Sequence, residues 1–87
     1  TFDVDAYHEK YKMVVEIEAG RAGMNYQFLK DIFEACMMHE VEILAIAVRM
    51  QYRKTQQDYE EVKKFLDTLY ASDRMKIPLN GILLIGY

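Results

Sequence analysis

The chain has a single cysteine, Cys36, among 87 residues, and it has no CxxC motif or cysteine–histidine pair at zinc spacing. An internal disulfide and a structural zinc site are therefore excluded, and a reducing cytoplasm is the expected compartment. The longest uninterrupted apolar run, from Ile43 to Val48, has six residues, whereas roughly 20 are needed to span a bilayer. No basic, apolar leader opens the sequence. These absences predict a domain that is neither membrane-spanning nor exported.

An excess of positive charge is also missing, because 14 Asp and Glu outnumber 11 Lys and Arg. Residues 1–43 hold nine acids and four bases, while residues 44–87 hold five acids and seven bases. A nucleic-acid-binding domain is expected to be basic, so any affinity for DNA needs a local patch or additional sequence. The hydrophobic content of 52% excludes disorder and predicts one globular domain with a modest core.

Apolar and polar side chains alternate in residues 2–7 and 11–18, and the polar residues 8–10 lie between these segments. This pattern predicts a β-hairpin with a short loop. The sequence begins with Thr1 rather than Met, and its first residues already have a strand pattern. We therefore expect the chain to be the distal part of a longer protein.

Two helices and two further strands are predicted after the hairpin. Helical spacing of apolar residues predicts helices over residues 25–39, with Asn25 as N-cap, and 55–72, with a capping box from Thr55 to Asp58. The aliphatic runs 41–48 and 82–86 are typical of strands buried on both faces of a parallel sheet. The predicted fold class is thus α/β, a mixed α+β sheet in which an antiparallel hairpin is followed by α-β-α-β in a single domain.

The second predicted strand has two chemically distinct faces. Because side chains alternate across a sheet, Met13, Val15 and Ile17 share one face, and Glu16 and Glu18 share the other. The apolar set is expected to face the core, which places both acids on the opposite side of the sheet.

The hairpin brings a further acid to this face, either Asp3 or Asp5. Converging carboxylates destabilise a sheet unless a cation compensates for them, and an oxygen-ligated Mg²⁺ or Mn²⁺ is the natural candidate. An ordinary hydrated strand face is the competing interpretation.

The motif and the order of elements together resemble the PD-(D/E)XK nuclease superfamily, most closely its BglII- and BamHI-like restriction endonucleases. The segments that carry the resemblance are Val4-Asp5, residues 15–21, residues 41–44, and Pro78 with residues 83–86. The resemblance covers nearly the whole chain, and it implies a restriction-endonuclease-like core that is truncated at its N-terminal end.

The resemblance also implies roles for individual residues. Asp5, or Asp3 as the alternative, would be the first metal ligand and Glu16 the second, with the main-chain carbonyl of Ile17 beside them. Glu18 stands where most members have Lys, and the BamHI-like branch assigns an acid there to the attacking water. Arg21, in a glycine-flanked turn, would meet the scissile phosphate. The implied activity is Mg²⁺-dependent hydrolysis of DNA by a homodimer.

The remaining basic residues offer weaker signals. Arg49, Arg53 and Lys54, with Tyr52 between them, form the only basic cluster, which is either a DNA contact or a solvated loop.

A non-catalytic scaffold or protein-interaction domain with the same fold is the alternative function. The acid at the usual lysine position and the acidic net charge favour that alternative.

Overall fold

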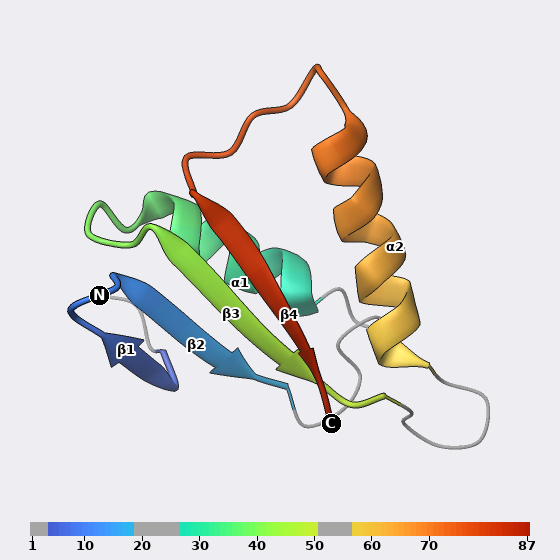
Figure 1. Cartoon of the computed structure of the whole chain (residues 1–87), viewed down its shortest axis with the longest axis horizontal. Coiled ribbons are helices and arrows are strands. Elements are labelled where there is room, and N and C mark those ends of the chain that lie inside the picture. Colours follow the sequence, from blue (N-terminus) through green and yellow to red (C-terminus); the bar gives the residue numbers. More distant parts are fainter. Residues whose placement is uncertain (1–3, 19–26, 51–56) are drawn as a thin grey trace.

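The structure is a computed structural model that describes residues 4–18, 27–50 and 57–87. Within these ranges, four strands form one sheet in the order β1-β2-β3-β4 (Figure 1). The first pair is antiparallel, and the next two pairs are parallel. The strands are β1 (Ala6–His8), β2 (Met13–Ile17), β3 (Ile43–Val48) and β4 (Gly81–Gly86). The predicted mixed sheet is confirmed.

Both described helices lie on the same face of this sheet (Figure 1). Helix α1 (Gln27–Met37) follows β2, and α2 (Asp58–Ala71) follows β3. Each helix therefore belongs to a crossover between parallel neighbours, and such crossovers are right-handed. Because the strand order advances in one direction through both crossovers, the two helices are placed on one side. Neither helix has the length and apolar character needed to cross a membrane.

The hydrophobic core lies between the two helices and the sheet. Leu44, Ile46 and Val48 of β3 are fully buried, and they alternate along the central strand so that all three face the helices. They pack in one cluster with apolar side chains from the other elements, among them Val14, Phe28, Ile32, Val62 and Leu66. The rings of Phe28 and Phe65 meet edge to face at 5.1 Å between centroids, which joins α1 to α2.

The expectation of burial on both faces is wrong for β4, whereas β3 has no exposed residue on either face. No described helix covers the second face of the sheet, and Leu83 and Ile85 of β4 are 49% and 41% exposed there. Ala45 is buried on this face because it lies at the centre of the sheet, between its register partners Val15 and Leu83.

The ends of the helices differ from the sequence expectations. Helix α2 begins at Asp58, and its N-cap is Gln57, whose side chain makes no capping hydrogen bond. Asp58 is therefore not the third helical residue of the predicted capping box, and Thr55 lies outside the described residues. The main-chain N–H of Tyr59 donates instead to the carbonyl of Arg49 at 3.1 Å, which ties the start of α2 to the end of β3. For α1, the predicted cap Asn25 also lies outside the described residues.

A close approach at the end of β4 requires a glycine. A Cβ atom built on Gly86 would lie 2.9 Å from Cδ2 of Tyr59 and closer still to Sδ of Met50. Both side chains belong to the junction between β3 and α2, so the absence of a side chain at Gly86 lets α2 pack against the end of β4. Gly81, at the other end of the strand, has no heavy atom within 4 Å of the same position.

Candidate functional site

Glu16 of β2 and Glu18, just after this strand, lie on the helix-covered face of the sheet, which contradicts the predicted orientation of the strand. Val14, which alternates with Glu16 and Glu18, is 1% exposed and belongs to the core. Ile17, which was expected to face the core, is 55% exposed on the open face. The reversal follows from the position of the helices, because the side of β2 that carries Val14 is the side that α1 and α2 cover.

Asp5 lies beside Glu16, where the hairpin pattern predicted either Asp3 or Asp5. Ala6 pairs with Val15, so the antiparallel register places Asp5 opposite Glu16. Oδ2 of Asp5 accepts a hydrogen bond from the main-chain N–H of Ile17 at 2.7 Å. Because β1 begins only at Ala6, this carboxylate takes the place of a main-chain acceptor and extends the pairing of β2 by one hydrogen bond. Asp3, the alternative first ligand, lies outside the described residues.

Glu16 is half-buried and experiences a negative environment. Burial raises the pKa of its carboxyl, and the negative charge of Asp5 raises this pKa further. A hydrogen bond from the main chain of Asp5 opposes this, while the charges of Glu18 and Glu34 add to the rise. Oε1 of Glu16 is buried and has no hydrogen-bond partner among the described residues. Glu16 therefore has one buried carboxylate oxygen that no described residue satisfies.

Asp31 of α1 is an additional acid that the sequence reasoning missed. It is only 6% exposed, and its pKa is raised to about 8, first by burial and then by a side-chain hydrogen bond with Glu18. The charges of Glu18, Glu16 and Glu34 raise it further. Oδ2 of Asp31 is buried without a hydrogen-bond partner in the described part of the chain. Asp5, Glu16, Glu18 and Asp31 are called the acidic cluster below.

A sequence signal for Asp31 did exist. Phe28, Ile32 and Ala35 form the buried stripe of α1, and a residue three positions after the first of these shares their helix face. Asp31 thus interrupts an apolar face with a charge, and an acid at such a position is rarely fully buried without a partner. The periodicity that identifies the helix therefore also marks Asp31 as the one charged residue on its buried face.

Main-chain hydrogen bonds hold Glu18 just beyond the carboxyl end of β2. Its N–H donates to the carbonyl of Ala47 at 2.8 Å, which continues the pairing with β3. Its carbonyl accepts a hydrogen bond from the hydroxyl of Tyr87, the residue that follows β4. The ends of three parallel strands thus fix the backbone at Glu18, while its side chain reaches Asp31. The main-chain carbonyl of Ile17 lies on the Asp5 side of β2, because the N–H and C=O of one strand residue point the same way.

The acidic cluster suits a hard cation in its chemistry, but it is not a ready-made metal site. All its donors are carboxylate oxygens, the ligands that Mg²⁺ prefers, and two of these oxygens lack partners. However, in residues 4–18, 27–50 and 57–87 no group of three His, Cys, Asp or Glu side chains is arranged to hold a metal ion. A cation would therefore have to draw carboxylates together by side-chain rotation.

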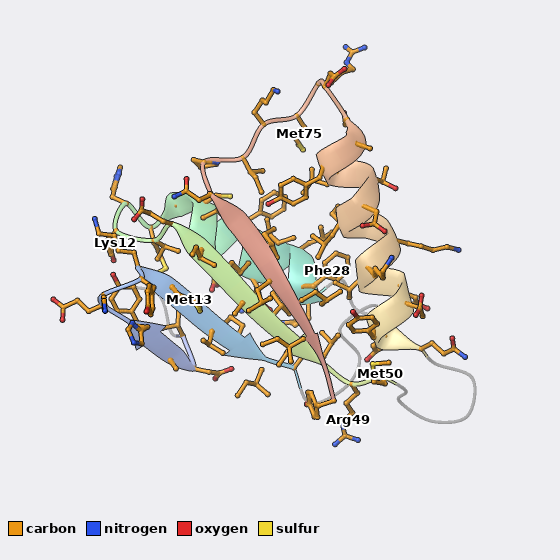
Figure 2. The ribbon with its side chains drawn as sticks, in the orientation of Figure 1. Lys12, Met13, Phe28, Arg49, Met50 and Met75 are labelled. Atoms are coloured by element: carbon orange, nitrogen blue, oxygen red, sulfur yellow. The ribbon has the colours of Figure 1, made fainter. Side chains whose placement is uncertain are left out.

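The predicted phosphate-binding and DNA-binding residues are only partly described. Arg21, Tyr52, Arg53 and Lys54 lie outside the described residues. Arg49 is exposed and follows β3 at the same end of the sheet as Glu18 (Figure 2). Lys12 lies at the opposite end of β2 (Figure 2), so the hairpin turn is remote from the acidic cluster.

Comparison of the chain with models of known protein families, with curated proteins and with solved structures finds no match.

Proposed function

We propose that the chain is a Mg²⁺-dependent endodeoxyribonuclease domain of the restriction-endonuclease type. The observation that carries the proposal is that Asp5, which precedes β1, lies opposite Glu16 near the carboxyl end of β2, two residues before Glu18. The element order, a hairpin followed by α-β-α-β, is the order that the resemblance implies. The unpartnered oxygen of Glu16 supports an ion at this position.

In this proposal each acid has a separate task. Asp5 and Glu16 hold the cation, with the carbonyl of Ile17 on the same side of β2. When bound, Mg²⁺ supplies charge neutralisation at the transferring phosphate and lowers the pKa of a coordinated water. Glu18 accepts the proton of the attacking water, and its fixed backbone restricts where that carboxylate can reach. Arg21 and the exposed Arg49 are the proposed phosphate contacts.

The proposed partners follow from the same chemistry. Cleavage of both strands of a duplex requires two sites, so we propose a homodimer on DNA with two-fold symmetry. The single cysteine is free and half-buried, which suits the reducing cytoplasm that we propose as the compartment.

A cleavage assay tests the proposal directly. Supercoiled plasmid is incubated with Mg²⁺ and the wild-type protein, the Glu16→Gln variant or the Glu61→Gln variant. Glu61 is an exposed acid of the first turn of α2, so its replacement is the matched control for the loss of one carboxylate. We expect nicked or linear DNA from the wild type and from Glu61→Gln, and intact plasmid from Glu16→Gln. Equal cleavage by all three proteins would contradict the assignment of Glu16.

A non-catalytic scaffold is the second candidate, and one observation favours it. The Asp5 carboxylate already serves a structural purpose, because it accepts the N–H of Ile17. A scaffold would need that hydrogen bond and no cation. Calorimetric titration with Mn²⁺ separates the two functions, since a scaffold shows no binding in the wild type and no change on Glu16→Gln.

A further inference from the structure

The open face of the sheet, which neither described helix covers (Figure 1), is built from uncharged side chains. The register of β2, β3 and β4 forms two rows on this face: Val15, Ala45 and Leu83, then Ile17, Ala47 and Ile85. None of the described strand residues that alternate onto this face is Asp, Glu, Lys or Arg. A sheet face that remains in water normally carries polar side chains at these positions. The composition of the open face is therefore that of a buried surface.

The heights of the side chains on this face also differ from strand to strand. Ala45 and Ala47 form a low strip along β3, and neither of them is exposed. The larger side chains of β2 and β4 stand on either side of it, where Ile17 and Leu83 are 55% and 49% exposed. A hollow lined by residues 43 and 80–83 lies where β4 begins. The open face thus has two raised aliphatic rows with a depression between them.

A face of this shape is complementary to a second copy of itself. When two such faces meet with a shift of one strand, the raised row of β4 in one copy lies over the alanine strip of β3 in the other. Two-fold symmetry makes the reciprocal contact identical. An uncharged face also avoids the like-charge repulsion that a charged face meets against its own copy. Two sheets stacked in this way pack about 10 Å apart and keep their helices outside.

The area of the open face bears on how stable such a pair is. Four strands with a mean length of about five residues cover about 300 Å², because strands lie about 4.8 Å apart and each residue rises about 3.3 Å. Tyr11, stacked on His8 beside Met13, and Tyr87, just after β4, lie at the rim and are 55% and 53% exposed. Each half-exposed ring adds about 100 Å². Two copies therefore bury about 1,000 Å², the lower limit of specific interfaces.

We propose that a second copy of the chain packs on the open face, so that two sheets stack between two outer layers of helices. The inference goes beyond the proposed function, because it names a dimer surface that needs neither DNA nor a cation. The acidic cluster lies on the helix side of the sheet and stays outside this interface. The buried area corresponds to a weak dimer with a dissociation constant in the micromolar range.

Sedimentation velocity of the chain from about 1 to 500 μM, without DNA or divalent metal, tests the inference. The variants are Leu83→Lys, Leu83→Ala and the control Phe33→Lys. Phe33 of α1 is 58% exposed on the helix side of the sheet, so its variant adds the same charge at an equally exposed apolar position. We expect the wild type and Phe33→Lys to pass from monomer to dimer as the concentration rises. Leu83→Lys should weaken association at least about 10-fold.

Circular dichroism separates loss of the interface from loss of the fold. Leu83→Ala adds no charge and should remain folded while it weakens the dimer, so it decides the question if Leu83→Lys does not fold. A wild type that is monomeric over the whole range would overturn the inference. Equal association of Leu83→Ala, Leu83→Lys and the wild type, or its loss in Phe33→Lys alone, would place the contact on another surface and also overturn it. None of these results changes the outcome of the plasmid assay for Glu16.

Methyl resonances provide a second readout that needs no variant. The methyl groups of Ile17, Leu83 and Ile85 should shift as the concentration of the wild type rises. Those of Ile46 and Val62, which are fully buried on the helix side, should stay in place. Shifts confined to residues of the two helices would contradict packing through the open face.

Discussion

Replacing Asp31 with Asn should stabilise the metal-free protein above neutral pH, because the amide cannot ionise at this buried position. The wild-type carboxyl has a pKa of about 8 in the folded protein, against 3.8 for an ordinary aspartate. Between these values the folded chain retains a proton that the unfolded chain has released. The unfolded state therefore binds fewer protons, and stability falls as pH rises from about 4 to about 8.

The size of this effect follows from the separation of the two pKa values. Each pKa unit corresponds to about 1.4 kcal/mol, so a difference of roughly four units sets an upper bound of about 6 kcal/mol. Relaxation of the surroundings and entry of water reduce the penalty for a buried ion. We expect about 2–4 kcal/mol of the wild-type stability to be lost across this range because of Asp31.

Urea unfolding followed by circular dichroism at pH 4.5, 6, 7 and 8.5 measures this dependence. Asparagine fills the same volume and does not ionise, so the Asp31→Asn variant should have nearly wild-type stability at pH 4.5 and exceed it by about 2–4 kcal/mol at pH 8.5. A shallower slope of the same sign should persist in the variant, because burial and neighbouring charges also raise the pKa of Glu16. Asp73→Asn, at an exposed aspartate after α2, is the control and should follow the wild type. Parallel curves for the wild type and Asp31→Asn would refute the reasoning.

Three further predictions concern the fold. Leu44→Ala should lower the free energy of unfolding by about 2–5 kcal/mol, because Leu44 is fully buried. Leu83→Ala, on the exposed face of β4, should lower it by less than about 1 kcal/mol. Equal losses of stability in urea unfolding would show that both faces are covered. Gly86→Ala should lower the free energy of unfolding by about 1–3 kcal/mol, because the added methyl group crowds α2. Gly81→Ala is the control and should be neutral or stabilising. A melting temperature unchanged by Gly86→Ala would contradict the close approach. Asp5→Ala should lower the free energy of unfolding by about 0.5–1.5 kcal/mol, because it removes the acceptor of the main-chain N–H of Ile17. Asp5→Asn keeps an acceptor oxygen and should retain most of this stability. Equal stability of the two variants in urea unfolding would count against that hydrogen bond.

The order of the elements was predictable from the sequence because it depends on local patterns. Alternation in the hairpin, helical spacing around Ile32 and Val62, and the aliphatic run of β3 each identify one element without reference to the rest. That Asp3 or Asp5 would lie beside the glutamates of the second strand was also predicted, because both strands were expected to turn their apolar sets to one face, and the observed register places Asp5 opposite Glu16. These predictions rest on interactions between residues close in sequence.

The orientation of the sheet was not predictable in the same way. In β2 both sets of alternating side chains contain apolar residues, Val14 on one side and Val15 with Ile17 on the other. Counting apolar residues favours the wrong side, because the sequence of one strand does not say which face the crossovers cover. The acidic site was consequently expected on the face of the sheet opposite the core, whereas the structure places Glu16 and Asp31 where burial raises the pKa of each.

The face of the sheet that neither described helix covers also has a calorimetric consequence. Unfolding raises the heat capacity by about 12–15 cal/mol/K per residue in ordinary globular domains, chiefly through newly hydrated apolar area. The side chains of Ile17, Leu83 and Ile85 are already about half exposed to water in the native state. Their further exposure on unfolding therefore adds less to the heat-capacity increment. The protein should thus have a smaller heat-capacity increment than its length implies, and a flatter dependence of stability on temperature.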